Sequence, residues 1–289
     1  MNRIGVIGAG VMGSGLAVDL STSGYEVILV DTEQAILNRA KEDVEKGIKF
    51  AGLYKKDIDG ETEEINKRVN YTLDISDVAT CEFIIENVTE DYEIKKDIYS
   101  KLDKICEPEV CFAVNTSCIS IDKIASLVSR KDKIIGMHFM NPVILKKSIE
   151  EVRGYHTSEE TIETAGRLLT SLGKKGILIR DAVGFASNRV SHLFMNEAMY
   201  VVMDQTCEPK DVDQIFRECF AHTMGPLETA DLIGLDTVMN SLDVLFESYH
   251  DMKYRCCPLL RQMVSQGRLG RKSGEGFYKY NNEKQIRKG

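Results

Sequence analysis

The stretch Arg3-Ile-Gly-Val-Ile7-Gly8-Ala-Gly10-Val-Met-Gly13 decides the fold class. Its first five residues form a largely apolar, β-prone run, and the next six fit the pattern G-x-G-x-x-G. The pattern is informative here because it directly follows a predicted strand and opens a predicted helix. Gly8 permits a tight turn, Gly10 lets the backbone approach a pyrophosphate, and Gly13 lets helix and strand pack closely. We therefore predict a Rossmann-type dinucleotide-binding turn.

The second β-prone run indicates which dinucleotide is bound. Glu26–Val30 ends at Asp31, and 31 − 13 = 18 residues separate Asp31 from the last glycine of the pattern. An acid at this spacing accepts hydrogen bonds from a ribose 2′-hydroxyl and repels a 2′-phosphate. Thr32 follows, and no arginine is present there to hold a phosphate. We expect NAD as the cofactor, bound by Gly8, Gly10, Val11, Met12, Gly13 and Asp31.

Strand and helix patterns alternate over the first 180 residues. The further predicted strands are Phe83–Val88, Val110–Val114, Lys133–Phe139 and Gly176–Arg180, and helical patterns cover Ile94–Ile105 and Ile121–Ser129. Such alternation predicts an α/β fold with a doubly wound, mostly parallel sheet. The charge-rich residues 41–70 contain few β-branched apolar residues, so we expect a helical excursion there rather than a crossover packed on the core.

The pattern changes at Gly184. From there to about residue 266 the apolar residues recur at helical spacing, with turns at Glu208-Pro209 and Gly225-Pro226. We therefore predict an NAD-binding domain over residues 1–183 and an all-α C-terminal domain over residues 184–289.

Composition excludes several classes of function. The chain has 289 residues, 45 acidic and 37 basic, for a net charge of −8. An acidic surface argues against nucleic acid as the main partner. No apolar run approaches the roughly 18 residues of a membrane span. The eight cysteines form no C-x-x-C pair, so we expect reduced thiols in a cytoplasmic protein and no metal site.

Polar residues gather where predicted strands end. The segments are Glu86–Glu90, Asn115–Ser117, Gly136–Pro142 and Asp181–Asn188. The first three follow strands of the predicted parallel sheet, and ligands bind at the carboxyl ends of such strands. These side chains are therefore candidates for an active site, and a buried structural role is the alternative for any one of them taken alone.

Together with later motifs, these segments resemble the L-3-hydroxyacyl-CoA dehydrogenase family, which includes bacterial 3-hydroxybutyryl-CoA dehydrogenases. The later motifs are His222–Glu228, Asp231–Asp236 and Leu269–Tyr278, and the match runs from Ile4 to Tyr280. The resemblance implies a Rossmann domain, a helical substrate and dimerisation domain, a homodimer, and reversible NAD-linked oxidation of the 3-hydroxyl of an acyl thioester.

The resemblance also implies roles for single residues. His138 matches the catalytic base, and its orienting acid lies twelve residues further on, at 138 + 12 = 150, which is Glu150. Glu151 is adjacent, but neighbours in an extended segment point to opposite faces, so only one of the two can reach the imidazole. Further matches are Ser117, Asn141 and Asn188 for substrate, and Glu90, Lys95, Asn115 and Lys272 for NAD. For Lys95 and Lys272, a solvated surface lysine is the alternative.

These residue types suit the implied chemistry. Hydride leaves C3 of the substrate while its hydroxyl loses a proton, and a histidine with a pKa of about 6.5 can accept that proton. Glu150 would then stabilise and orient the imidazolium, as the acid of a catalytic triad does. Ser117 and Asn188 can donate hydrogen bonds to substrate oxygens.

The chain departs from the family pattern in places that bear on the substrate. The second proline of the histidine motif is missing after Val143, and Phe50 and Tyr54 stand where family members place lysines that bind CoA phosphates. We therefore expect a substrate on acyl carrier protein, such as the glyceryl-carrier protein of hydroxymalonyl extender-unit formation in polyketide biosynthesis. A slipped alignment in a charged helix would remove this argument.

Three alternatives stay open. The first is a 3-hydroxybutyryl-CoA dehydrogenase of fatty acid or butanoate metabolism. The second, from another class, is a non-catalytic NAD-binding protein, which retention of His138, Glu150, Ser117 and Asn188 disfavours. The third is a β-hydroxyacid dehydrogenase with lysine as its acid and base, which the context Gly136-Met-His-Phe-Met-Asn-Pro142 disfavours.

Overall fold

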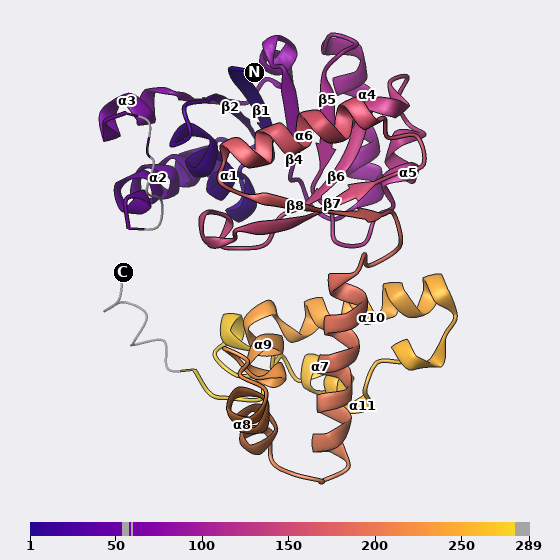
Figure 1. Ribbon diagram of the computed structural model, residues 1–289. Coiled ribbons are helices and arrows are strands. Elements are labelled where there is room, and N and C mark those ends of the chain that lie inside the picture. The colour runs from indigo at the N-terminus through magenta and orange to yellow at the C-terminus, as the bar shows by residue number, and fades with distance from the viewer. Residues whose placement is uncertain (54–57, 59, 281–289) are drawn as a thin grey trace. The chain divides into compact units, whose positions relative to one another are not determined.

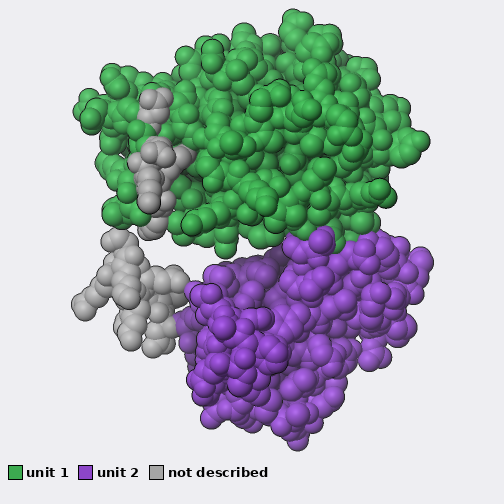
Figure 2. Space-filling view, in the orientation of Figure 1, with its two compact units in different colours: residues 1–185 green, residues 186–289 purple. Residues whose placement is uncertain are grey.

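The chain is divided into two units. The computed structural model describes residues 1–53, 58 and 60–280. Residues 1–185 form the first unit, and the described residues from 186 onward form the second (Figure 2). The predicted boundary between residues 183 and 184 lies within two residues of this division.

The first unit is built on one sheet of eight strands (Figure 1). Their order across the sheet is β3-β2-β1-β4-β5-β6-β7-β8. All neighbours are parallel except β6 and β7, which are antiparallel, so the predicted α/β, mostly parallel sheet is confirmed. The strands are β1 (Arg3–Ile7), β2 (Glu26–Val30), β3 (Val69–Thr72), β4 (Phe83–Glu86), β5 (Cys111–Val114), β6 (Ile134–His138), β7 (Ser148–Arg153) and β8 (Lys175–Arg180).

Helices cover both faces of this sheet, and each face has its own apolar core. Helices α1 (Val11–Ser21), α2 (Gln34–Ala51) and α6 (Glu159–Ser171) pack on one face, and α4 (Tyr92–Ile105) and α5 (Ile121–Ala125) on the other. Because strand residues alternate between faces, Ile149 of β7 belongs to the first core and Val152 to the second. Strands buried on both faces explain why the sequence shows continuous apolar runs rather than alternation.

Residues 41–70 are mainly helical, as predicted, but the expectation that they do not form a crossover packed on the core was wrong. Helix α2 is part of a crossover: after it the chain forms α3 (Thr62–Lys67) and re-enters the sheet as β3, beside β2. Leu37, Ala40, Val44 and Ile48 lie in the first core, at the spacing of one helix face. The charged residues on the other faces of α2 dominate its composition and hide this apolar stripe. Tyr54, Lys55 and Lys56 lie outside the described residues.

The second unit is helical, as predicted. It contains α7 (Ser187–Met203), α8 (Pro209–Cys219), α9 (Pro226–Ile233), α10 (Leu235–Tyr249) and α11 (Pro258–Ser265) around a core of their own. The buried carboxylate of Asp231 accepts hydrogen bonds from the backbone N–H groups of Phe277 and Tyr278 and from the Tyr280 hydroxyl. These bonds fasten the segment that follows α11 to α9.

All eight cysteines are free thiols, as expected. No helix in the described part of the chain is long and apolar enough to cross a membrane.

Candidate active site

The turn between β1 and α1 has the geometry that its glycines predict. Gly8 adopts φ +92°, which favours glycine. A Cβ on Gly13 would collide with the carbonyl oxygen of Gly8, so β1 and α1 could not approach this closely with a larger residue. A Cβ on Gly10 would meet nothing within 4 Å, and Gly10 is the N-cap of α1. The backbone is therefore open to a phosphate at the N-terminus of a helix.

Asp31 lies at the carboxyl end of β2 and is tied to this turn. Its Oδ2 accepts a hydrogen bond from the Ala9 N–H at 2.8 Å, and its Oδ1 accepts one from the Thr32 N–H at 2.8 Å. An open glycine turn, a helix N-terminus and a carboxylate beside them fit the pyrophosphate and ribose of NAD. Val11, at the start of α1, is 71% exposed beside the turn.

His138 and Glu150 form a buried pair on neighbouring strands. They are directly opposed in the antiparallel pairing of β6 with β7, and the Nδ1 of His138 is 2.9 Å from the Oε2 of Glu150. Both side chains are about nine-tenths buried. The Phe185 ring lies against the imidazole, with 5.6 Å between the ring centroids. A carboxylate that accepts from Nδ1–H fixes the tautomer and leaves Nε2 as a base.

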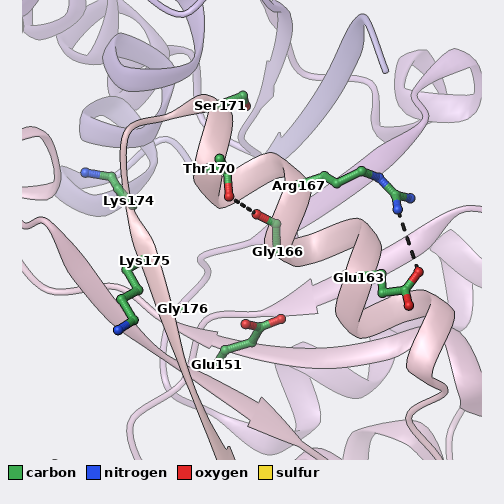
Figure 3. Close-up of a pocket in the computed structure, with 9 residues that line it drawn as sticks. All are labelled: Glu151, Glu163, Gly166, Arg167, Thr170, Ser171, Lys174, Lys175 and Gly176. Atoms are coloured by element: carbon green, nitrogen blue, oxygen red, sulfur yellow. Dashed lines mark hydrogen bonds and ion pairs between the residues drawn. The ribbon is translucent and has the colours of Figure 1, made fainter.

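Glu151 points to the other face of β7. It lines a groove of about 910 Å³ between α6 and β8, which also contains Glu163, Arg167 and Gly176 (Figure 3). Burial raises the pKa of the Glu151 carboxyl, and its Oε1 is buried without a hydrogen-bond partner among the residues that the structure describes. Within the described residues only Glu150 of the two glutamates bonds to His138, as the alternation of the strand requires.

Ser117 lies on the other side of the imidazole. Its Oγ is 3.1 Å from the Nε2 of His138. Glu90 organises the segment that carries Ser117, because its Oε1 accepts from the Thr116 hydroxyl and from the N–H groups of Ser117 and Cys118. Ser117, His138 and Glu150 therefore form a continuous series of hydrogen bonds at the carboxyl ends of β5 and β6, with Glu150 on β7 opposite His138.

Lys95 is not a solvated surface lysine, so that alternative was wrong. Its side chain is fully buried, and its ammonium donates to both carboxylate oxygens of Glu86, at 2.7 and 2.8 Å, and to the Asn115 carbonyl at 3.2 Å. Asn115 also joins strand ends through its side chain, which donates to Asn87 and accepts from the Phe139 N–H.

Sequence reasoning assigned no role to Glu86 and overlooked Tyr99. Glu86 ends β4 and is fully buried, and the hydroxyl of Tyr99 donates to it at 3.2 Å. Burial raises the pKa of the Glu86 carboxyl, and the charge of Lys95 opposes this rise. The sequence did contain a signal for this buried cluster, because Glu86 directly follows the apolar run Phe83–Ile85. A charge at the end of a buried strand needs a buried partner.

Three further predicted site residues are Asn141, Asn188 and Lys272. Asn141 is exposed, three residues after the end of β6. Asn188 and Lys272 belong to the second unit, where the Asn188 carbonyl contacts His192 and Lys272 forms an ion pair with Asp236. Their substrate and cofactor roles stay predictions. The described residues contain no cluster of metal-binding side chains.

Comparison with known proteins assigns the chain to a family. The profile described as 3-hydroxyacyl-CoA dehydrogenase, NAD binding domain, matches residues 3–182, and the profile of the C-terminal domain of the same enzymes matches residues 184–280. The chain belongs to the 3-hydroxyacyl-CoA dehydrogenase family. It is an NAD-dependent 3-hydroxyacyl-CoA dehydrogenase, and the resemblance drawn from its motifs is confirmed at this level.

Individual relatives match this dehydrogenase along nearly its whole length. A protein of Deinococcus radiodurans named "Probable 3-hydroxybutyryl-CoA dehydrogenase" is 43% identical over 279 residues, which cover 96% of this chain and 100% of the relative. A Bacillus subtilis protein of the same name is 38% identical over 97% of this chain and 98% of its own. The crystal structure of (S)-3-hydroxybutyryl-CoA dehydrogenase from Ralstonia eutropha matches with a TM-score of 0.91 at 36% identity, covering 98% of this chain and 100% of that one.

Proposed function

We propose that this dehydrogenase oxidises the 3-hydroxyl of short-chain 3-hydroxyacyl-CoA thioesters of the 3-hydroxybutyryl class, reversibly and with NAD. The observation that carries the proposal is the series of hydrogen bonds from Ser117 through His138 to Glu150. It lies at the carboxyl ends of β5 and β6, in the unit that contains the glycine turn between β1 and α1. The names of the relatives support the acyl class.

In this proposal the chain's own residues handle the proton. Nδ1–H of His138 donates to Glu150, so the Nε2 lone pair is available to accept the proton of the substrate hydroxyl. Ser117 Oγ, 3.1 Å from Nε2, donates a hydrogen bond to the same substrate oxygen and orients it. Glu150 stabilises the imidazolium that results. Bound NAD supplies the hydride acceptor. In reverse, His138 returns the proton to the developing alkoxide.

Two observations bear on the carrier of the acyl group, and they favour different carriers. The sequence favoured acyl carrier protein because of Phe50 and Tyr54. Phe50 is 54% exposed near the end of α2, and Tyr54 lies outside the described residues. The relatives are named for CoA esters. Their names therefore favour CoA over acyl carrier protein as the carrier. A carrier-bound substrate is kept as the second candidate, on the evidence of Phe50 alone.

A paired assay separates the carriers. The same 3-hydroxybutyryl group is presented on CoA and on acyl carrier protein, and NADH formation is followed at each substrate concentration. We expect a higher kcat/KM for the CoA ester. A higher value for the carrier-bound ester would favour the second candidate, and Phe50→Lys should then improve use of CoA, because a lysine adds a charge-assisted phosphate contact. No NADH from either ester would contradict the proposed function itself.

We also propose that the second unit carries a homodimer interface. Large apolar side chains are exposed on its helices and directly after α8: Val190 (70%), Ile215 (46%), Phe220 (63%) and Leu232 (52%). Exposed apolar residues of this size favour burial against a partner. Light scattering at micromolar concentration should give about twice the 32.5 kDa chain mass. Val190→Asp or Leu232→Asp should raise the monomer fraction, and a monomeric parent protein would contradict the proposal.

A further inference from the structure

The buried ammonium of Lys95 has no hydrogen left for another ligand. A lysine ammonium has three donors. Two of them meet the carboxylate oxygens of Glu86, at 2.7 and 2.8 Å, and the third meets the Asn115 carbonyl at 3.2 Å. The side chain has no exposed surface. This leaves no hydrogen of Lys95 for the direct NAD contact that the family resemblance implied, and we infer that Lys95 acts on the site through these neighbours.

The carboxylate of Glu86 is equally occupied. Besides the two bonds from Lys95, its Oε1 accepts from the Val88 N–H at 2.7 Å, and its Oε2 accepts from the Tyr99 hydroxyl at 3.2 Å. Two charges removed from water in this way are tolerated only when geometry and hydrogen bonds are well satisfied. The pair therefore has one well-defined position, set by β4, α4 and the segment after β5.

The pair reaches the reacting groups through Glu90. The Nζ of Lys95 is 4.0 Å from the Oε2 of Glu90, whose other oxygen accepts from the Thr116 hydroxyl and from the Ser117 and Cys118 N–H groups. The Lys95 ammonium attracts the Oε2 of Glu90, while the Oε1 of Glu90 keeps its bonds to residues 116–118. The Asn115 carbonyl holds the same segment one residue earlier in the chain.

We propose that the buried Lys95–Glu86 ion pair positions Ser117 against His138. It fixes the Asn115 carbonyl and the Glu90 carboxylate, and these fix the segment on which the Ser117 hydroxyl lies 3.1 Å from the imidazole. Lys95 and Glu86 are positioning residues, since neither has a hydrogen-bonding atom free to touch the substrate. This inference rests on the proposed function, in which Ser117 orients the substrate oxygen.

A double-mutant cycle tests the coupling. The charge-free variant, Lys95→Met with Glu86→Gln, removes both charges and keeps the approximate shapes of the two side chains. Replacing both partners of a buried ion pair is often neutral for stability. We expect kcat for 3-hydroxybutyryl-CoA to fall about tenfold to a hundredfold, because a small misplacement of a positioning group costs that much. Ser117→Ala should then lower kcat far less in the charge-free background than in the parent. Equal losses in both backgrounds would overturn the proposal.

Two further variants keep the test decisive. Tyr99→Phe removes one hydrogen bond to Glu86 but retains both charges of the ion pair, so it is the matched control. In the Tyr99→Phe background, Ser117→Ala should lower kcat as much as in the parent. If the charge-free variant does not fold, Glu90→Gln removes the charge that faces Lys95 from a side chain that is 40% exposed. Glu90→Gln should also make Ser117→Ala less costly, and additivity there would again overturn the proposal.

A measurement that does not depend on catalysis distinguishes failure of this inference from failure of the proposed function. The imidazole NMR signals of His138, assigned by their loss in His138→Gln, are followed in the parent, in Ser117→Ala and in the charge-free or Glu90→Gln variant. Displacement of Ser117 should move these signals in the direction that Ser117→Ala moves them. Signals that stay at the parental position would overturn the inference. An inactive parent whose His138 signals still respond would contradict only the proposed function.

Discussion

Glu150 lies directly opposite His138 in the antiparallel pairing of β6 with β7, and the two side chains meet at 2.9 Å. The contact depends on the one antiparallel junction in the described sheet, where the strands run in opposite directions and paired residues share a face. The acid is therefore held by strand hydrogen bonds on both sides of the contact. Such a pair is preorganised for the imidazolium that forms when the base accepts a proton.

Replacing His138 by glutamine should abolish most turnover and leave NADH binding. Glutamine fills similar space but cannot take up the substrate proton, so kcat should fall by about 10²–10⁴-fold, the usual contribution of general acid–base catalysis. Stopped assays with 3-hydroxybutyryl-CoA measure the loss, and quenching of NADH fluorescence checks the fold and the cofactor site. A folded variant with nearly parental kcat would remove His138 from this role.

The two adjacent glutamates should differ sharply in their effect on rate. Glu150→Gln replaces the charge that stabilises the imidazolium, and kcat should fall on the order of 10²–10⁴-fold. Glu151→Gln alters a side chain on the opposite face of β7, and kcat should change little. Initial rates at saturating substrate decide between them. The reverse ranking would mean that Glu151 is the acid that serves His138.

Glu151 should make the folded state depend on pH. Burial raises the pKa of its carboxyl above the ordinary value of 4.5, so the folded state binds this proton more tightly than the unfolded state. Its contribution to stability is complete below about pH 4.5 and is lost as the pH rises through the folded-state pKa. Glu151→Gln, which stays neutral, should have a larger free energy of unfolding than the parent at pH 8.

Urea unfolding of both proteins at several pH values measures this difference. The gain of Glu151→Gln over the parent should shrink as the pH falls toward 4.5, because the parental carboxyl in the folded state becomes protonated over this range. A difference that is the same at pH 8 and pH 4.5 would contradict the expectation.

Asp31 should determine the choice of cofactor. Its carboxylate lies beside the glycine turn, where a 2′-phosphate would meet like charge at a cost of several kcal/mol. We expect kcat/KM to favour NADH over NADPH by at least about tenfold, since each 1.4 kcal/mol is a factor of ten. Asp31→Asn retains the shape and most acceptors but not the charge, and should narrow the gap. Equal use of both cofactors by the parent would defeat the assignment.

Much of this site could be predicted because its residues are close in sequence to recognisable strand ends. The glycine turn and Asp31 follow from a spacing that one βαβ unit imposes. The choice of Glu150 over Glu151 came from the family spacing of twelve residues after His138, and the alternation of an extended strand allowed only one of the two to reach the imidazole. The register of β6 with β7 agrees with this choice.

The buried ion pair could not be predicted in the same way. Lys95 lies on an otherwise amphipathic, charge-rich helix, where a lysine is normally solvated. Its burial depends on Glu86, nine residues earlier at the end of a strand, and on the packing of α4 against the sheet. The crossover through α2 was missed for a similar reason, since four apolar positions determined its packing and the many charged ones did not. Tertiary packing determined both outcomes.

The separation of Ile149 and Val152 into different cores protects the catalytic pair from a pairing error. A slip of one residue between β6 and β7 would still bring a carboxylate opposite His138, because Glu151 would replace Glu150. The position of a carboxylate opposite His138 therefore does not distinguish the correct strand register from the slipped one. The slip would instead turn Ile149 and Val152 each toward the core in which the other now packs, because a shift of one residue moves every side chain of a strand to the opposite face. The correct register of the two strands that carry the catalytic pair is thus selected by two residues that take no part in the chemistry.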